Sequence, residues 1–294
     1  MLSAAPAIAW TDEFARAVDR LIDVSVDDYY NPYRTFEWPE SIEPEGEGLW
    51  MSRELLSVHG TAAERELTPQ QLVELSRWES VNLYSLIAHG IRELLIEVMR
   101  RIHTPGYEIP TPYFHHFIGE ENEHMWFFAE FCLRYCGRIY PDRRMVFPTD
   151  ERSPEMNNFI VFSQILIFEQ IGDYFNAKMA ADEQLPHTVR EVNRIHHRDE
   201  SRHIAFGGKL VKALFDEVRR THTAEEVEEV GRYLRGYIDL IIQMLYSRDA
   251  YEDAGIADPA RFRASVVSDP ARAAITARIT ERTNNFYRRI GLFH

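Results

Sequence analysis

The chain contains only two cysteines among its 294 residues, Cys132 and Cys136. They lie four positions apart in a segment with helical periodicity, so they share one helix face and lack the usual geometry of a disulfide staple. A protein that uses so little cysteine does not depend on disulfides for its stability. We therefore expect a reducing compartment, the cytoplasm.

Basic residues are also scarce, since 33 Lys and Arg face 47 Asp and Glu and the net charge is -14. Nucleic acid is recruited by clustered basic residues, so no nucleic-acid partner is expected. No apolar run approaches the roughly 18 to 20 residues that a membrane span needs. The short apolar stretch from Met1 to Trp10 has no basic residues before it, which predicts no export signal.

What the sequence does contain is long stretches of helical periodicity. Apolar residues recur at helical spacing over about 69–103, 112–137, 154–183 and 187–220, and the first three of these starts are marked by a capping residue followed by proline. No strand-like alternation of useful length occurs. The sequence predicts an all-α protein, one domain over residues 1–294, whose core is a four-helix bundle at about 69–220.

Flanking helices are expected on both sides of that core. A short helix near 11–23 and a loop at 29–50 belong to the N-terminal part, 1–67. Two or three more helices are predicted within 224–294, where they would pack around the bundle.

Two Glu-x-x-His pairs fall in the second and fourth long segments, Glu121 with His124 and Glu200 with His203. Residues three apart are neighbours on a helix surface, so each pair presents a carboxylate and an imidazole together. About one such pair is expected by chance, so the pairs alone prove little. Each is, however, preceded in the previous helix by a glutamate within an apolar stretch.

Those two glutamates are Glu93 and Glu169, and they make the two halves of the bundle alike. The separations are similar, 28 residues from Glu93 to Glu121 and 31 from Glu169 to Glu200. Folding the halves together would place four carboxylates and two imidazoles around one point, as in helix bundles that bind two metal ions.

The physical reason for a metal is charge, because unpaired carboxylates in a helical core are costly or take up protons. Two divalent cations would balance four carboxylates, and a mixture of Glu oxygen and His nitrogen suits iron or manganese. His196, four before Glu200, lies on the same helix stripe as a further ligand. The predicted ligand set is Glu93, Glu121, His124, Glu169, His196, Glu200 and His203.

Alternatives remain open at several of these positions. The same residues could form a buried hydrogen-bond network without metal, and His196 could be a non-ligand. Glu79 and Glu97 compete with Glu93 for the role on the first long helix. Glu120 and Asp199 adjoin the ligand candidates, where outer carboxylates could accept the second N–H of a metal-bound imidazole.

At this point the sequence resembles a known family, the ferritin-like diiron N-oxygenases typified by p-aminobenzoate N-oxygenase, over roughly residues 70–210. The resemblance rests on the stretches Trp78-Glu79-Ser80, Glu120-Glu121-Asn122-Glu123-His124 and His196-His197-Arg198-Asp199-Glu200-Ser201-Arg202-His203, together with Glu93 and Glu169. Two features depart from the family pattern. Glu120 stands where the family usually has Asp, and the gap between Glu93 and Glu120 is shorter than usual.

The resemblance implies a ferritin-like fold and a non-haem diiron monooxygenase of secondary metabolism. Its expected reaction is N-oxygenation of an arylamine to a hydroxylamine and then a nitroso or nitro product. It implies two iron ions, with manganese also compatible, O2 as co-substrate, an external electron-transfer partner, an amine that is free or carrier-bound, and a homodimer.

Three other functions stay open. A carrier-bound acyl desaturase or hydroxylase is one, because Glu120-Glu121-x-x-His124 matches the first motif of that group. A ferroxidase or iron-storage cage is another, and a helical scaffold without metal is the third.

Overall fold

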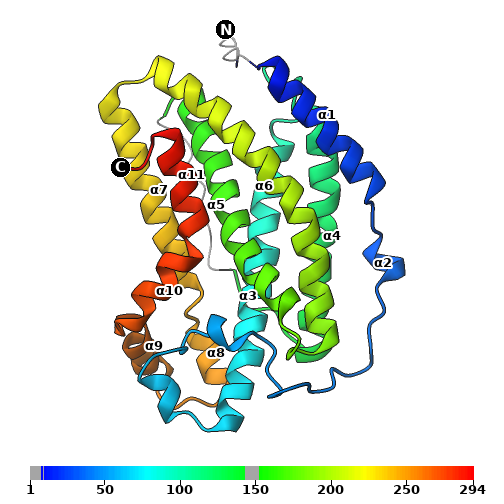
Figure 1. Cartoon of the computed structure of the whole chain (residues 1–294), viewed down its shortest axis with the longest axis vertical. Coiled ribbons are helices and arrows are strands. Elements are labelled where there is room, and N and C mark those ends of the chain that lie inside the picture. Colours follow the sequence, from blue (N-terminus) through cyan, green and yellow to red (C-terminus); the bar gives the residue numbers. More distant parts are fainter. Residues whose placement is uncertain (1–7, 9, 143–151) are drawn as a thin grey trace.

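The bundle is built from four long helices that run side by side (Figure 1). The computed structural model describes residues 8, 10–142 and 152–294 of the chain. The four helices are α3 (Pro69–Met99), α4 (Thr111–Cys136), α5 (Pro154–Ala181) and α6 (His187–Thr221), with α3 paired to α4 and α5 to α6. Their bounds agree with the predicted segments to within about four residues, the usual uncertainty of helix ends.

Local chemistry explains why these helices begin where they do. Thr68 caps α3 with a full capping box, its side chain accepting from the backbone N–H of Gln71 while the Gln71 side chain accepts from Thr68. Ser153 caps α5 through the backbone N–H of Met156. Proline follows each cap at the first helical position, where its missing N–H is not needed.

Additional helices flank the bundle, as predicted. On the N-terminal side lie α1 (Asp12–Asp27), which packs against α4 and α6, then α2 (Pro32–Thr35) and two short 3-10 helices, η1 (Arg53–Leu55) and η2 (Ala63–Glu66). The C-terminal part forms α7 (Ala224–Met244), α8 (Arg248–Asp253), α9 (Pro259–Ser268), α10 (Ala271–Ile279) and α11 (Glu281–Ile290).

The prediction of two or three helices after residue 224 was too low. Ser247 and Asp258 each cap a new helix, and Pro270 begins another, so this segment is divided more finely than its periodicity suggests. No strand occurs in the described ranges, and the prediction of an all-α bundle with flanking helices is confirmed.

No helix in the described part of the chain is both long enough and apolar enough to cross a membrane. Most of Met1 to Trp10, on which the prediction about export rests, lies outside the described residues.

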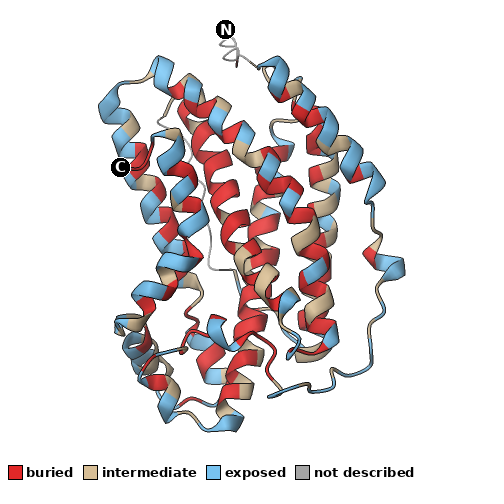
Figure 2. Cartoon of the chain, viewed as in Figure 1, coloured by how far each residue is buried: buried red, intermediate tan, exposed pale blue. Residues whose placement is uncertain are grey.

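Helix α5 forms the centre of the core (Figure 2). Every residue from 159 to 167 on it is buried, because α3, α6 and α7 surround it. α3 approaches α5 closely at Gly90, where an added Cβ would lie 2.1 Å from Cζ of Phe168. Phe168 directly precedes Glu169, so this contact also supports a predicted site residue.

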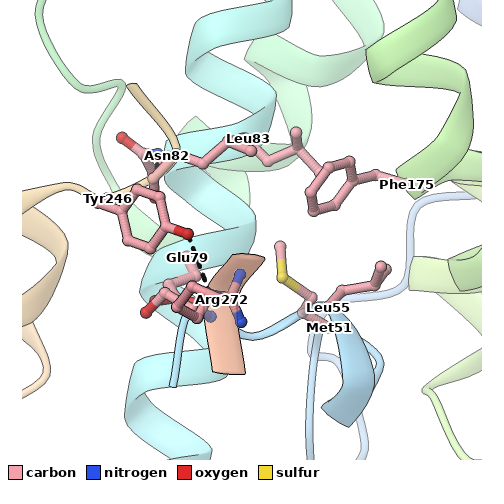
Figure 3. A pocket seen from close by; sticks show the side chains of 10 residues that line it. Met51, Leu55, Glu79, Asn82, Leu83, Phe175, Tyr246 and Arg272 are labelled. Atoms are coloured by element: carbon pink, nitrogen blue, oxygen red, sulfur yellow. Dashed lines mark hydrogen bonds between the residues drawn. The ribbon is translucent and has the colours of Figure 1, made fainter. Parts of the chain in front are cut away.

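A buried polar cluster connects the C-terminal helices to α3 (Figure 3). Glu79 is 4% exposed and accepts hydrogen bonds from the backbone N–H and the hydroxyl of Ser57. Beside it, Arg272 of α10 donates to the hydroxyl of Tyr246 at 3.0 Å and to the carbonyl of Leu56 at 3.1 Å. Glu79 therefore belongs to this cluster and is not free for the role predicted for Glu93. Burial raises the pKa of Glu79 to about 7.

Glu79→Gln should remove a pH dependence of stability. Because the pKa rises from 4.5 to about 7 on folding, the proton on Glu79 stabilises the fold fully below pH 4.5, and this contribution is lost as pH rises through 7. Relative to the variant, the free energy of unfolding of the wild type should fall by up to about 3 kcal/mol between pH 4.5 and 7.5. Urea unfolding of both proteins at both pH values measures this difference, and parallel pH profiles would contradict it.

Candidate metal centre

The two Glu-x-x-His pairs face each other across the bundle interior. Glu121 and His124 come from α4, and Glu200 and His203 come from α6. One potential ligand atom from each lies within 4.8 Å of all the others, and none of the four residues is more than 4% exposed. The structure thus brings together the four residues of the two pairs.

Glu169 of α5 and His196 of α6 complete the cluster. The Nε2 atom of His196 lies 3.1 Å from Oε1 of Glu200, and its ring meets that of His124 at 4.5 Å between centroids. Glu169 is 5% exposed and interacts electrostatically with both Glu200 and Glu121. Six of the seven predicted ligands are therefore gathered in one buried group.

Glu93 is not part of this group, which corrects the predicted placement. Its carboxylate accepts a hydrogen bond at 2.8 Å from Arg92, and its side chain is 26% exposed. The rival Glu97 is buried, but it is bound by Arg100 and Arg101. Helix α3 consequently contributes no glutamate to the cluster.

Several polar atoms of the cluster lack the partners that buried groups normally have. The atoms without a hydrogen bond are Oε2 of Glu121, Oε1 of Glu169, Nδ1 of His196, both carboxylate oxygens of Glu200, and Nδ1 of His203. Buried polar groups are nearly always satisfied, and an unmade bond costs about 1 to 3 kcal/mol each. So many unsatisfied atoms in one place fit an arrangement built around cations.

The nearby charges shift the pKa values of these carboxylates in opposite directions. Burial, with the charges of Glu200 and Glu121, holds the pKa of Glu169 well above its usual range. Burial also opposes ionisation of Glu200, but the close contact with His196 and the positive charge of His203 hold its pKa well below the usual value. The cluster therefore contains one protonated carboxyl group, on Glu169, and one ionised carboxylate, on Glu200.

The three imidazoles also differ. Burial lowers the pKa of His196 to about 4, so its ring is neutral and can offer a lone pair. Burial would also lower the pKa of His124, but hydrogen bonds to Asp199 and Glu121 raise it to about 10, and Glu200 and Glu121 raise that of His203 well above its usual value. Without metal, protons neutralise the cluster, and a metal ion would have to displace them.

A second layer of carboxylates orients two of the imidazoles. The Nε2 atom of His124 lies 3.1 Å from Oδ2 of Asp199, and Nε2 of His203 lies 2.7 Å from Oε2 of Glu120. Arg202 donates to both of these carboxylates at 2.9 Å and so joins them. The contacts expected of Glu120 and Asp199 are present, whereas the role of Arg202 was missed. Its position three after Asp199, on the same helix face, was the available signal.

A narrow apolar cavity lies on one side of the cluster. Its volume is about 20 Å³, enough for about one water-sized molecule. It is lined by Val98, Phe114, Phe117, Phe162, Ile165, Leu166, Glu169, His203, Phe206, Gly207 and Leu210. Only Glu169 and His203 among these are polar, so the cavity can admit a small apolar molecule next to the cluster.

A four-helix bundle with inward-facing Glu and Glu-x-x-His side chains defines a ferritin-like protein with a carboxylate and histidine metal site. The family model described as p-aminobenzoate N-oxygenase AurF matches residues 11–291. The chain therefore belongs to this family of N-oxygenases, which are oxidoreductases. No curated protein matches the chain significantly.

Removing the charge of the second layer should weaken metal binding. Asp199→Asn and Glu120→Gln leave the cluster itself unchanged but reduce the basicity of the imidazoles that they orient. Each is expected to lower the affinity for a divalent metal by about 10- to 100-fold, as such outer partners typically do. Competition with a chelator measures the affinity. The exposed Asp216→Asn on α6, which pairs with Lys212, is the matched control, and equal affinities in all variants would contradict the assigned role.

Proposed function

We propose that the chain is a non-haem diiron monooxygenase that uses O2 to oxygenate the nitrogen of an amine, most simply an arylamine. The observation that carries the proposal is the group of unsatisfied carboxylate and imidazole atoms, buried in the bundle of a chain that belongs to an N-oxygenase family. If these residues formed a buried hydrogen-bond network without metal, few of their polar atoms would lack partners.

Two carboxylates lie among the three imidazoles. Oε1 of Glu121 lies 2.7 Å from Nδ1 of His203 and 3.3 Å from Nδ1 of His124. Oε1 of Glu200 lies within 3.6 Å of these two imidazoles and of His196. These carboxylates and imidazoles would therefore hold the ions together. Glu169 and His196 would complete the ligand set.

Three carboxylates in place of four change the expected charge balance. Two divalent ions bring four positive charges, and Glu121, Glu169 and Glu200 bring three negative ones when ionised. One positive charge is left for a small external anion to balance, because α3 supplies no carboxylate.

When bound, two iron ions would supply the oxygen activation that side chains cannot perform. Oxygenation of a primary amine consumes one O2, two electrons and two protons, and yields one hydroxylamine and one water. The electrons must come from an external donor. The chain's own residues hold the ions, orient His124 and His203 through Asp199 and Glu120, and keep a water-poor cavity beside Glu169.

The Glu and His ligands suit iron and manganese alike. Iron is proposed because it is the metal that non-haem oxygenases use to activate oxygen. A reducing cytoplasm is the proposed location, consistent with the free thiols of Cys132 and Cys136. A homodimer is the proposed assembly.

The ligand set can be tested residue by residue through metal content. Glu169→Gln and His196→Ala should each reduce the iron retained after gel filtration below two per chain, because each removes a ligand from the buried group. Glu93→Gln should retain the wild-type amount, because its carboxylate pairs with Arg92 at the surface. Elemental analysis measures the stoichiometry, and loss of iron in Glu93→Gln would restore Glu93 to the ligand set.

The reaction can be tested with chemically reduced, iron-loaded protein exposed to labelled O2. The expected result is p-aminobenzoate or aniline carrying one labelled oxygen on nitrogen, detected by mass spectrometry. The metal-free protein is the control. Oxygen consumption that oxidises only ferrous ions and leaves every amine unchanged would contradict the proposal and favour a ferroxidase.

A further inference from the structure

A groove of about 430 Å³ is lined by residues of α5, α6 and α11, and α11 packs against α5. This volume is within the range of small-molecule sites. It is lined by Gln170, Ile204, Ala205, Gly208, Lys209, Lys212, Arg282, Phe286, Arg289 and Ile290. On the α6 side the groove is lined by the small residues Ala205 and Gly208, which leave it space. On the α11 side it is lined by the apolar residues Phe286 and Ile290.

The rim of this groove is positively charged, although the chain carries a net charge of -14. Its lining contains four basic residues and no acidic one. Lys212 and Arg282 already pair with carboxylates outside the groove. Arg289 has no carboxylate within 4.0 Å among the described residues, and Lys209 reaches one only at 4.0 Å. Arg289 and Lys209 therefore have charge available for an anion.

The floor of the groove carries an unsatisfied amide. Gln170 is 5% exposed, and its Oε1 atom has no hydrogen-bond partner. A buried carbonyl oxygen without a donor is unfavourable, and an N–H or O–H group of a bound molecule would satisfy it. This observation is independent of the charge on the rim, and both point to a polar ligand.

The groove also adjoins the metal centre along the chain. Gln170 follows Glu169, and Ile204 follows His203. The apolar cavity beside the centre is lined by the opposite faces of the same two helices. Between the two spaces α5 and α6 meet closely, since a Cβ on Gly207 would lie 3.3 Å from Cδ1 of Leu166.

We propose that this groove binds an organic oxyanion, with the negative group between Lys209 and Arg289, the apolar body against Phe286, and an N–H or O–H group of that body donating to Oε1 of Gln170. Because α5 and α6 pack closely between the groove and the metal centre, this site is separate from the centre and does not depend on the proposed function. A carboxylate on a small molecule and the phosphate of a pantetheine arm share this chemistry. Both are oxyanions that bind Arg and Lys.

Calorimetry on the iron-loaded protein at low ionic strength tests the groove with three probes. Benzoate is compared with benzamide, its uncharged analogue of the same shape, and with pantetheine 4′-phosphate. We expect a negatively charged probe to bind about tenfold more tightly than benzamide and to weaken with added salt. Tight binding of benzoate indicates a free carboxylate, and tight binding of the phosphate indicates a carrier arm.

Variants locate the binding. The double variant Lys209→Gln with Arg289→Gln should weaken the favoured probe about tenfold. Gln170→Leu should weaken pantetheine 4′-phosphate, which has N–H and O–H donors, but not benzoate, which has none. Arg288→Gln is the matched control, because Arg288 is an exposed neighbour of Arg289 that does not line the groove. Anion binding that is unchanged in the double variant would overturn the proposal and indicate direct binding to the metal ions. Equal binding of all three probes would also overturn it.

Failure of this proposal is distinguishable from failure of the proposed function. Should the wild type oxygenate amines while no oxyanion binds at the groove, only the groove assignment falls. Should the oxyanion bind at the groove while no amine is oxygenated, the anion site stands and only the proposed function falls.

Discussion

The structure depends on one electrostatic constraint, which is that carboxylates buried in a helical core must be neutralised. Glu121, Glu169 and Glu200 are nearly inaccessible to water, and ionised groups in that environment are strongly unfavourable without a positive partner. In the metal-free chain, protons on the imidazoles and on Glu169 serve this purpose. Cations would serve it better, because they would also satisfy the lone pairs that have no partner now.

The surroundings of the cluster are arranged to hold this charge in place. Arg202 is 5% exposed and joins two carboxylates that each hold one imidazole. These contacts turn Nδ1 of His124 and Nδ1 of His203 toward the centre of the cluster. On another side, Phe168 packs onto Gly90 and holds the backbone next to Glu169. Charge therefore orients His124 and His203, and packing holds the backbone beside Glu169.

Much of the fold could be predicted from the sequence, because helix caps and apolar periodicity are local signals. Thr68 and Ser153 begin their helices where expected. The two Glu-x-x-His pairs could be assigned to one site because helical spacing fixes which side chains share a face. The short C-terminal helices were undercounted, since caps at Ser247 and Asp258 are spaced more closely than an amphipathic pattern can reveal.

Glu93 shows where this reasoning stops. An apolar stretch and a matching separation favoured it, but neither fixes the angle of a residue around the helix axis. Ile91 and Leu94 of α3 are 1% exposed, and Glu93 lies about 200° around the axis from Ile91, at roughly 100° per residue. Its side chain is thereby turned toward Arg92 and solvent. The groove beside α11 was equally beyond prediction, because it depends on how distant helices pack.

The most direct test of the central claim is a crystal structure of the iron-loaded protein with anomalous diffraction measured at the iron edge. The account predicts two peaks about 3.5 to 4 Å apart, as in other two-metal sites, lying among Glu121, His124, Glu169, His196, Glu200 and His203. A structure without iron in which these side chains hydrogen-bond only to one another would contradict it.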